Sequence, residues 1–228
     1  MQAILSLVDL RKDYQEGEIV VHVLKGINME VEKGEFTAIA GPSGSGKTTL
    51  LNLIGCLDKP TSGKVFIDGV DMSTYSKKEL ANIRREKIGF VFQSFNLIPI
   101  LTAYENVAFP LSLLGKSADE IDKKVKGILN DVGLGGLEHR YPRELSGGQQ
   151  QRVAVARALI KEPSIILADE PTANLDSTTG GEILDLMKKM NEQKEATFVF
   201  STHDHSVMDR AKRVVNLRDG QIYSDERK

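Results

Sequence analysis

The chain has 228 residues, of which 40% are hydrophobic, and its 30 Lys and Arg against 32 Asp and Glu give a formal net charge of -2. This composition is typical of one folded globular unit, and the lack of a basic excess argues against nucleic acid or anionic lipid as a partner. The single cysteine, Cys56, excludes an intrachain disulfide, and no run of roughly 18 apolar residues predicts a membrane span, so we expect a cytoplasmic chain in a reducing compartment.

The beginning of the chain carries three short apolar stretches, AILSLV, VVHVL and FTAIA, at residues 3–8, 20–24 and 36–40. The polar, glycine-containing segments YQEGE and EKGE separate them, which is the pattern of strands joined by turns. We therefore predict that a small antiparallel sheet opens the fold.

The segment GPSGSGKTTL, residues 41–50, places three glycines and a lysine between the apolar stretch FTAIA and an apolar helical segment. Its spacing fits the pattern G-x-x-x-x-G-K-[ST]. At a helix N-terminus, free amides and the helix dipole favour an anion, and glycines let the backbone approach it closely. The alternative is a flexible glycine turn with a solvated lysine. We predict a nucleoside triphosphate site that comprises Gly41, Pro42, Ser43, Gly44, Ser45, Gly46, Lys47, Thr48 and Thr49.

Two side chains of this segment have specific predicted roles. Lys47 directs a full positive charge toward the β- and γ-phosphates. The Thr48 hydroxyl is a ligand for Mg²⁺. The predicted ligand is therefore a nucleoside triphosphate together with magnesium.

The remainder of the chain alternates apolar runs with helical patterns. The runs KIGFVF, SIILAD, ATFVFST and RVVNL are typical of strands covered on both faces, which favours an α/β core with a largely parallel sheet. Residues 102–114, 117–132 and 147–160 have helical periodicity, and the pair Ser117 and Glu120 predicts a capping box.

We therefore predict an α/β fold in a single domain over residues 1–228. Its P-loop NTPase core, with a mostly parallel sheet and an N-terminal antiparallel β subdomain, takes residues 1–92 and 164–228. An inserted α-helical subdomain takes residues 93–163.

A second helix also begins with glycines. In RELSGGQQQRVAVARALI, Ser146 is a good N-cap, but Gly147 and Gly148 occupy the first turn, where each costs about 1 kcal/mol relative to alanine. An ordinary helix cap does not explain two glycines. We interpret this helix start as a second anion-binding position.

The run SIILADEP ends in two adjacent carboxylates, Asp169 and Glu170. In parallel sheets a ligand lies beyond the carboxyl ends of the strands, so both acids should approach the phosphates. Asp169 is the predicted Mg²⁺ ligand, and Glu170 is placed to orient and deprotonate the attacking water. The alternative is that the two acids cap the following helix.

Together, LSGGQ at residues 145–149, GPSGSGKT and IILADE resemble the nucleotide-binding subunits of ABC transporters, and the resemblance spans essentially the whole chain. It implies that Tyr14 stacks on adenine, that residues 173–176 form the D-loop and that His203 is the switch histidine near the γ-phosphate. It also implies that Gln93 is the Q-loop glutamine and a Mg²⁺ ligand. Without the resemblance, Tyr14 and Gln93 read as a strand-edge aromatic and a polar strand end. The implied catalytic residues are Glu170, His203, Lys47 and Gln93.

The resemblance further implies a head-to-tail homodimer when ATP is bound. Ser146, Gly147, Gly148 and Gln149 of one copy, with Asp176 of the D-loop, would then close over the triphosphate held by the other. ATP binding would close the dimer, and hydrolysis would open it.

Within the family, the chain looks most like the subfamily of macrolide and peptide exporters, the lipoprotein-releasing machine and the cell-division ATPase. The segment SFNLIPIL after Gln93 departs from the lipoprotein-releasing pattern, which favours the exporter-like branch. The resemblance implies a membrane permease that docks on residues 93–109 and holds the chain peripherally at the cytoplasmic face. The apolar docking candidates, which alternatively pack the subdomain, are Phe95, Leu97, Ile98 and Leu101.

Two other functions remain as alternatives. A soluble ABC-type ATPase acting on nucleic acid or ribosomes would usually carry a coiled-coil insertion, a zinc hook or a second ATPase head. A regulatory nucleotide sensor that does not hydrolyse ATP would be expected to have lost Glu170 or His203. We therefore expect no nucleic-acid partner.

Overall fold

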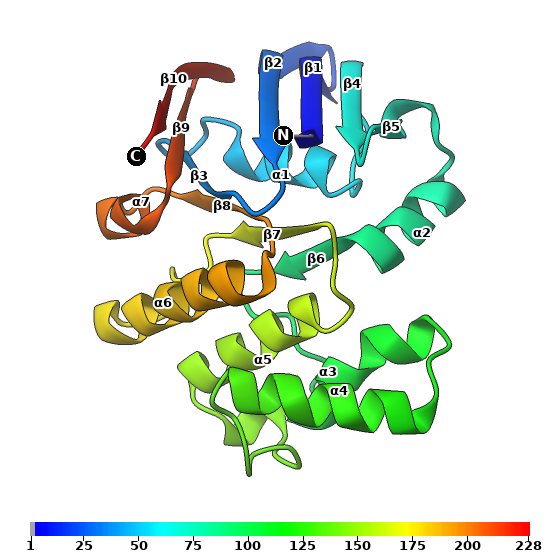
Figure 1. Ribbon diagram of the computed structural model, residues 1–228. Helices are drawn as coiled ribbons and strands as arrows, with labels where there is room; N and C mark the ends of the chain where they lie inside the picture. The colour runs from blue at the N-terminus through cyan, green and yellow to red at the C-terminus, as the bar shows by residue number, and fades with distance from the viewer. Residues whose placement is uncertain (1–2) are drawn as a thin grey trace.

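The computed structural model describes residues 3–228, in which two sheets lie above a layer of helices (Figure 1). The larger sheet has six strands in the order β10-β9-β3-β8-β7-β6. Five of these strands run parallel, and β10 pairs antiparallel at the edge. The strands are β3 (Phe36–Ala40), β6 (Ile88–Val91), β7 (Ile165–Asp169), β8 (Phe198–Thr202), β9 (Arg213–Arg218) and β10 (Gln221–Arg227).

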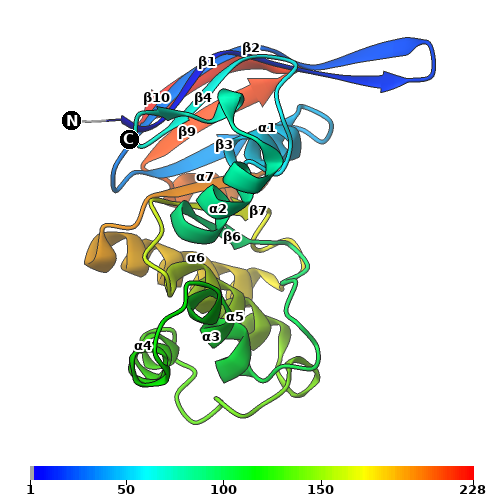
Figure 2. The same ribbon diagram turned by 90° about the vertical axis from the view of Figure 1, so that its right-hand side faces the viewer.

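The smaller sheet is antiparallel, with the strand order β2-β1-β4-β5. Its strands are β1 (Ala3–Glu16), β2 (Ile19–Glu32), β4 (Ser62–Ile67) and β5 (Val70–Asp71). The hairpin of β1 and β2 projects beyond the rest of the molecule (Figure 2). The third apolar stretch of the sequence, FTAIA, is β3; it pairs in parallel with β8 and β9 and so belongs to the parallel sheet, where all five of its residues are buried.

Within residues 3–228, seven α-helices complete the fold, with short 3₁₀ turns at Met72–Thr74 and Pro142–Glu144. Helix α1 lies between the two sheets, whereas α3 to α6 cover the opposite face of the parallel sheet (Figures 1 and 2). The helices are α1 (Lys47–Ile54), α2 (Lys77–Lys87), α3 (Ala103–Leu113), α4 (Ala118–Asp131), α5 (Gly147–Leu159), α6 (Ser177–Lys194) and α7 (His205–Arg210).

The parallel sheet is packed on both faces, as its continuous apolar runs predict. Along β7, Ile166 and Ala168 face the helical layer, and Ile165 and Leu167 face α1 and the antiparallel sheet. This alternation follows from the two-residue repeat of a strand. The carboxyl ends of the central strands are therefore held from two sides, which fixes the residues that follow them.

The predicted cap of α4 is only half formed. Ser117 accepts a hydrogen bond from the backbone N–H of Glu120, as expected, but the Glu120 carboxylate forms ion pairs with Lys116 and Lys124 instead of returning to the Ser117 backbone. Neighbouring lysines one turn away compete successfully for a solvent-exposed carboxylate. Among the helices of residues 3–228, none is long and apolar enough to cross a membrane.

Candidate functional site

Helix α1 begins without a side-chain cap. Its N-cap residue is Gly46, whose left-handed backbone has φ 103°, and no side chain accepts a hydrogen bond from the first turn. Every other α-helix in the described part of the chain has a Ser, Thr or Asp cap. The amides at the start of α1 are thus left for an external acceptor, and the helix dipole makes an anion the favoured one.

Next to these amides lie a buried positive charge, on Lys47, and a buried hydroxyl, on Ser45. Lys47 is buried, and its Nζ donates to the carbonyl oxygens of Gly41 at 2.8 Å and Pro42 at 3.0 Å. These are neutral acceptors, so the buried charge has no anionic partner among its described hydrogen bonds. The Ser45 hydroxyl is also buried and has no hydrogen-bond partner within residues 3–228. A buried cation beside uncapped amides favours the binding of a phosphate, because both groups interact favourably with negative charge.

A hydroxyl and a carboxylate face each other next to this loop. Thr48 Oγ1 donates to Asp169 Oδ1 at 3.3 Å, which joins the start of α1 to the end of β7. Residues 3–228 contain no cluster of three or more His, Cys, Asp and Glu side chains placed to hold a metal. One carboxylate and one hydroxyl nevertheless fit Mg²⁺, which commonly takes only one or two carboxylates and completes its shell with substrate phosphates and water.

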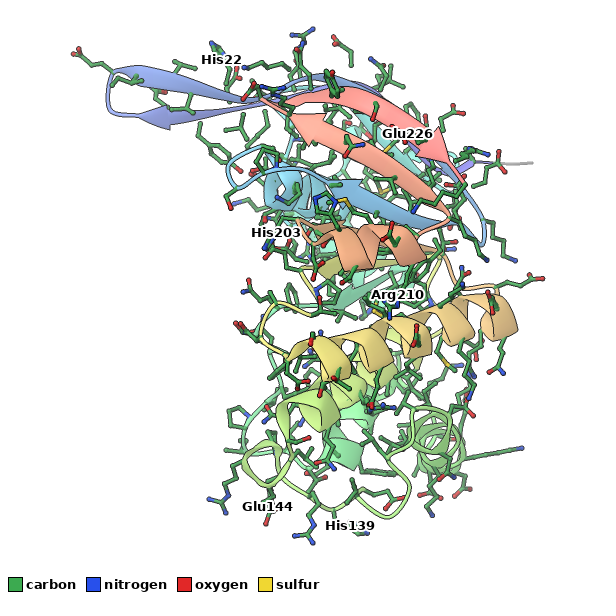
Figure 3. All side chains as sticks on the ribbon, turned by 90° about the vertical axis from the view of Figure 1, so that its left-hand side faces the viewer. His22, His139, Glu144, His203, Arg210 and Glu226 are labelled. Carbon is green, nitrogen blue, oxygen red and sulfur yellow. The ribbon has the colours of Figure 1, made fainter. Side chains whose placement is uncertain are left out.

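Glu170 directly follows β7 and lies beside His203, which follows β8. Glu170 Oε1 is 3.0 Å from His203 Nδ1. The Glu170 side chain is 24% exposed and that of His203 is 58% exposed, so the pair is accessible to water. Figure 3 shows His203 at the edge of the core, on the side toward which the β1–β2 hairpin projects. The two residues predicted for base and switch are therefore in contact.

Tyr14 lies on β1 near the same loop. Its hydroxyl donates to Asp58 at 2.9 Å, and Lys12 Nζ is 4.7 Å from the ring centroid. Burial raises the pKa of the Tyr14 phenol, to which the Asp58 hydrogen bond adds, and Thr49 is close enough to oppose that shift. The ring is 38% exposed, so part of its surface is free to stack on a base.

Gln93 lies against the D-loop. Its side-chain Nε2 is 3.4 Å from Asn174 Oδ1, and Asn174 Nδ2 donates to the Gln93 carbonyl at 3.0 Å. In the described residues its side chain does not hydrogen-bond Thr48 or Asp169. Asp176 caps α6 by accepting from the amides of Thr178 and Thr179. Hydrogen bonding from the Thr179 side chain lowers the pKa of the Asp176 carboxyl, and the two amide hydrogen bonds add to this effect.

The start of α5 is closed by its own side chains. Ser146 Oγ accepts from the Gln149 amide at 3.3 Å, and Gln149 Oε1 accepts from the Ser146 amide at 2.9 Å. A Cβ on Gly148 would lie 2.5 Å from Thr179 Cγ2, so packing against α6 requires this glycine. A Cβ on Gly147 would lie 3.2 Å from the flexible end of Leu175 and 3.7 Å from Phe95 Cζ, the second of which is an ordinary contact distance. Packing therefore explains Gly148 and leaves Gly147 for another reason.

The structure adds residues that the sequence patterns did not identify. Ser201 contacts both Asp169 and the backbone of Glu170, and within the predicted D-loop it is Asn174 that contacts Gln93. Ser201 stands two positions before His203 at the end of a strand adjacent to β7, and that placement is the one signal in the sequence that points to it.

Comparison with known proteins gives consistent matches. The family described as "ABC transporter" matches residues 24–173. An uncharacterised ABC transporter ATP-binding protein of Thermotoga maritima is 50% identical over 228 residues, covering 100% of this chain and 97% of that protein. The macrolide export ATP-binding/permease protein MacB of Syntrophobacter fumaroxidans is 49% identical over 221 residues, which are 96% of this chain and 31% of that protein.

Solved structures of similar chains share the fold. The dimeric post-hydrolysis structure of the ATP-binding cassette MJ0796 bound to ADP and Pi has a TM-score of 0.89 at 48% identity and covers 98% of each chain. MJ0796 itself is a protein of Methanocaldococcus jannaschii. The structure of cbiO1 from Clostridium perfringens, part of the transporter complex cbiONQ, also has a TM-score of 0.89, at 33% identity, over 100% of this chain and 89% of that one.

Proposed function

The chain belongs to the ABC transporter family and is an ATP-hydrolysing subunit of such a transporter, and on that premise we propose how its residues divide the work. One copy supplies the phosphate-binding loop at residues 41–49, and a second copy supplies the start of α5. The observation that carries the proposal is the uncapped start of α1 beside a buried lysine. The amides and Lys47 Nζ bind the triphosphate once Nζ exchanges its carbonyl acceptors for phosphate oxygens.

Thr48 and Asp169 would hold Mg²⁺, as their chemistry and mutual contact allow. When bound, the ion neutralises charge on the β- and γ-phosphates. Gln93 joins them in the proposal as a further ligand, because its side chain is exposed and its contact with Asn174 is long enough to exchange. The resemblance to the family, and not a contact in this structure, supports this last role.

Glu170 is the proposed general base. Its carboxylate accepts a proton from the attacking water, and His203 Nδ1 orients that carboxylate through the 3.0 Å contact. Lys47 stabilises the charge that develops on the transferred phosphoryl group. A partly exposed pair is accessible to solvent in the single chain, so closure by a second copy is what excludes bulk water.

We further propose where the permease docks. A cavity of about 540 Å³ opens between α2, β6 and α3, and its exposed apolar side chains are Leu57, Phe109 and Leu113. The expected candidates Phe95, Leu97, Ile98 and Leu101 do not line it; each is half-buried, and Leu97 is packed on the core. Phe109 belongs both to the predicted docking stretch and to the cavity, so we place the docking surface in the cavity.

The charge of the cavity indicates what kind of segment it accepts. Arg84, Arg85, Arg157 and Lys161 line it, and no Asp or Glu stands among its lining residues in the described chain. Burial lowers the pKa of the Lys161 ammonium to about 8, and backbone carbonyls alone satisfy its two hydrogen bonds, to Arg84 and Arg85. An amphipathic helix with an apolar face and acidic side chains fits this surface.

Two experiments test these proposals. Phosphate release per chain should rise with protein concentration, because each complete site needs two copies. Full specific activity at high dilution would contradict the shared site.

For docking, Leu113→Glu should release the chain from membranes of its own cells, whereas Tyr223→Glu, on an exposed position of β10, should leave it attached. Equal behaviour of the two variants would contradict the docking surface.

A further inference from the structure

Ser201 joins two residues of the proposed catalytic centre. It is fully buried in β8, where it stands opposite Asp169 in the strand ladder. Its hydroxyl donates to Asp169 Oδ1 at 2.5 Å and accepts from the backbone N–H of Glu170 at 3.0 Å. One buried hydroxyl thereby orients the Asp169 carboxylate and provides a partner for an amide that lies just beyond the end of β7.

The amide that Ser201 holds belongs to a residue in an unusual conformation. Glu170 has φ 43°, in the left-handed region, which is sparsely populated by residues with a side chain. Such a conformation persists only where the surroundings fix it, and residues of this kind cluster at functional sites. The left-handed turn aims the Glu170 carboxylate, so the groups that hold the turn also aim the carboxylate.

Gln151 holds the other side of the same turn. It is fully buried on α5, and its Nε2 donates to the carbonyl oxygen of Pro171, the residue after Glu170, at 2.6 Å. Its Oε1 has no hydrogen-bond partner within residues 3–228. The one described hydrogen bond of this side chain therefore holds the turn. Its amide oxygen stays buried without a partner, which is unfavourable.

We infer that Ser201 and Gln151 are positioning residues that hold the Glu170 backbone from both sides and so aim its carboxylate toward water and His203. The inference rests on the proposed role of Glu170. It also links two parts of the proposed machine, because Gln151 belongs to the same helix whose start would meet the ATP of a second copy. The Gln151 hydrogen bond is then a direct link between α5 and Pro171, the residue that follows Glu170.

The test compares Ser201→Ala and Gln151→Leu with Thr197→Val. Thr197 is a matched control, because it is also buried and its hydroxyl accepts from the Gly34 amide at 3.0 Å, away from the site. The first readout is the NMR signal of the His203 ring, measured without nucleotide. His203 is one of four histidines in the chain. The second is the steady-state kinetics of ATP hydrolysis, separated into kcat and KM.

Both site variants should move the His203 signal and lower kcat about tenfold while KM for ATP changes less than about twofold. Thr197→Val should lower the melting temperature without either effect, and Ser201→Thr, which keeps the hydroxyl, should restore most of kcat. If Ser201→Ala fails to fold, Gln151→Leu alone tests the inference by the same two readouts. Site variants that behave like Thr197→Val would overturn the inference.

The result separates this inference from the proposed function. A wild-type chain that fails to hydrolyse ATP would contradict the proposed function, whereas the His203 signal, measured without nucleotide, would still report whether Ser201 and Gln151 set the position of Glu170. A His203 signal that neither variant moves would overturn the positioning role even if ATP hydrolysis is confirmed.

Discussion

The starts of α1 and α5 both contain glycine, but they differ in what satisfies their first amides. Gly46 offers α1 no side-chain acceptor, and Lys47 beside it is buried among neutral carbonyls. Ser146 and Gln149 cap α5 reciprocally. The first helix start therefore has no side-chain acceptor within its own chain, whereas at the second the capping box provides acceptors for the amides of Ser146 and Gln149.

The two helices also lie on opposite faces of the parallel sheet, as Figure 1 shows. Figure 3 shows His203 at the edge of the core and Glu144, two residues before Ser146, at the far end of the helical layer. An ATP held at α1 therefore meets a helix start like that of α5 only if another copy supplies it. The comparison teaches that glycines alone do not distinguish the two helix starts, whereas the missing side-chain cap marks α1 as the one that holds the phosphates within a single chain.

The largest expected effect is on the rate of ATP hydrolysis, the step that separates the two copies in the proposed mechanism. Glu170→Gln keeps the shape of the side chain but removes the proton acceptor, so hydrolysis should slow about 10³-fold. With ATP and Mg²⁺ the variant should accumulate as a dimer, which sedimentation velocity measures. His205→Gln, at the first residue of α7 and outside the described site contacts, is the control. A monomeric Glu170→Gln under these conditions would show that α5 does not complete the site.

The second effect tests the open helix start itself. Lys47→Ala removes the buried charge, and because a hydrogen bond to a charged group contributes about 1.5–3 kcal/mol, ATP affinity should fall roughly 10- to 100-fold. Equilibrium binding of a fluorescent ATP analogue measures this. Lys123→Ala, on the exposed face of α4, removes the same charge elsewhere and should bind normally. An unchanged ATP affinity of Lys47→Ala would contradict the placement of the ATP phosphates at the start of α1.

The third effect separates capping from ligand binding at α5. Ser146→Ala should cost about 1 kcal/mol of folding free energy, and Ser76→Ala should cost a similar amount, because Ser76 and Glu79 form the same capping box on α2. Only Ser146→Ala should also weaken ATP-driven dimerisation, by about tenfold, in the Glu170→Gln background. If the two serine variants dimerise equally well, Ser146 is only a cap.

The parallel core and the phosphate-binding loop could be predicted from sequence because their signals are local. Four apolar runs each became a strand of the parallel sheet, and the glycine pattern before α1 sits at the end of β3 as expected. The third early run, FTAIA, was harder to place, since a five-residue apolar stretch does not reveal its neighbours. Its parallel pairing with β8 and β9, which come from the other end of the chain, assigns it to the parallel sheet.

The support of Glu170 could not be predicted, because it depends on contacts between distant parts of the chain. Ser201 reaches Asp169 across 32 positions, and Gln151 reaches Pro171 from another layer of the fold. Neither residue type carries a pattern of its own. The capping box at Ser117 failed for a related reason: the motif states which partners are available, while nearby lysines decide which one Glu120 takes.

The smallest expected effect lies at the base end of the site, where an aromatic ring would add to the phosphate contacts of α1. Base stacking on an aromatic side chain contributes about 1–3 kcal/mol, and Tyr14 is only partly exposed, so Tyr14→Ala should weaken ATP binding about fivefold. Tyr14→Phe loses the hydrogen bond to Asp58 but keeps the ring, so its affinity should stay within about twofold of wild type. Because every base has a stacking face, GTP should lose the same factor as ATP. A loss confined to ATP, or one as large in Tyr14→Phe, would instead mean that polar contacts around the phenol select the base and that stacking does not.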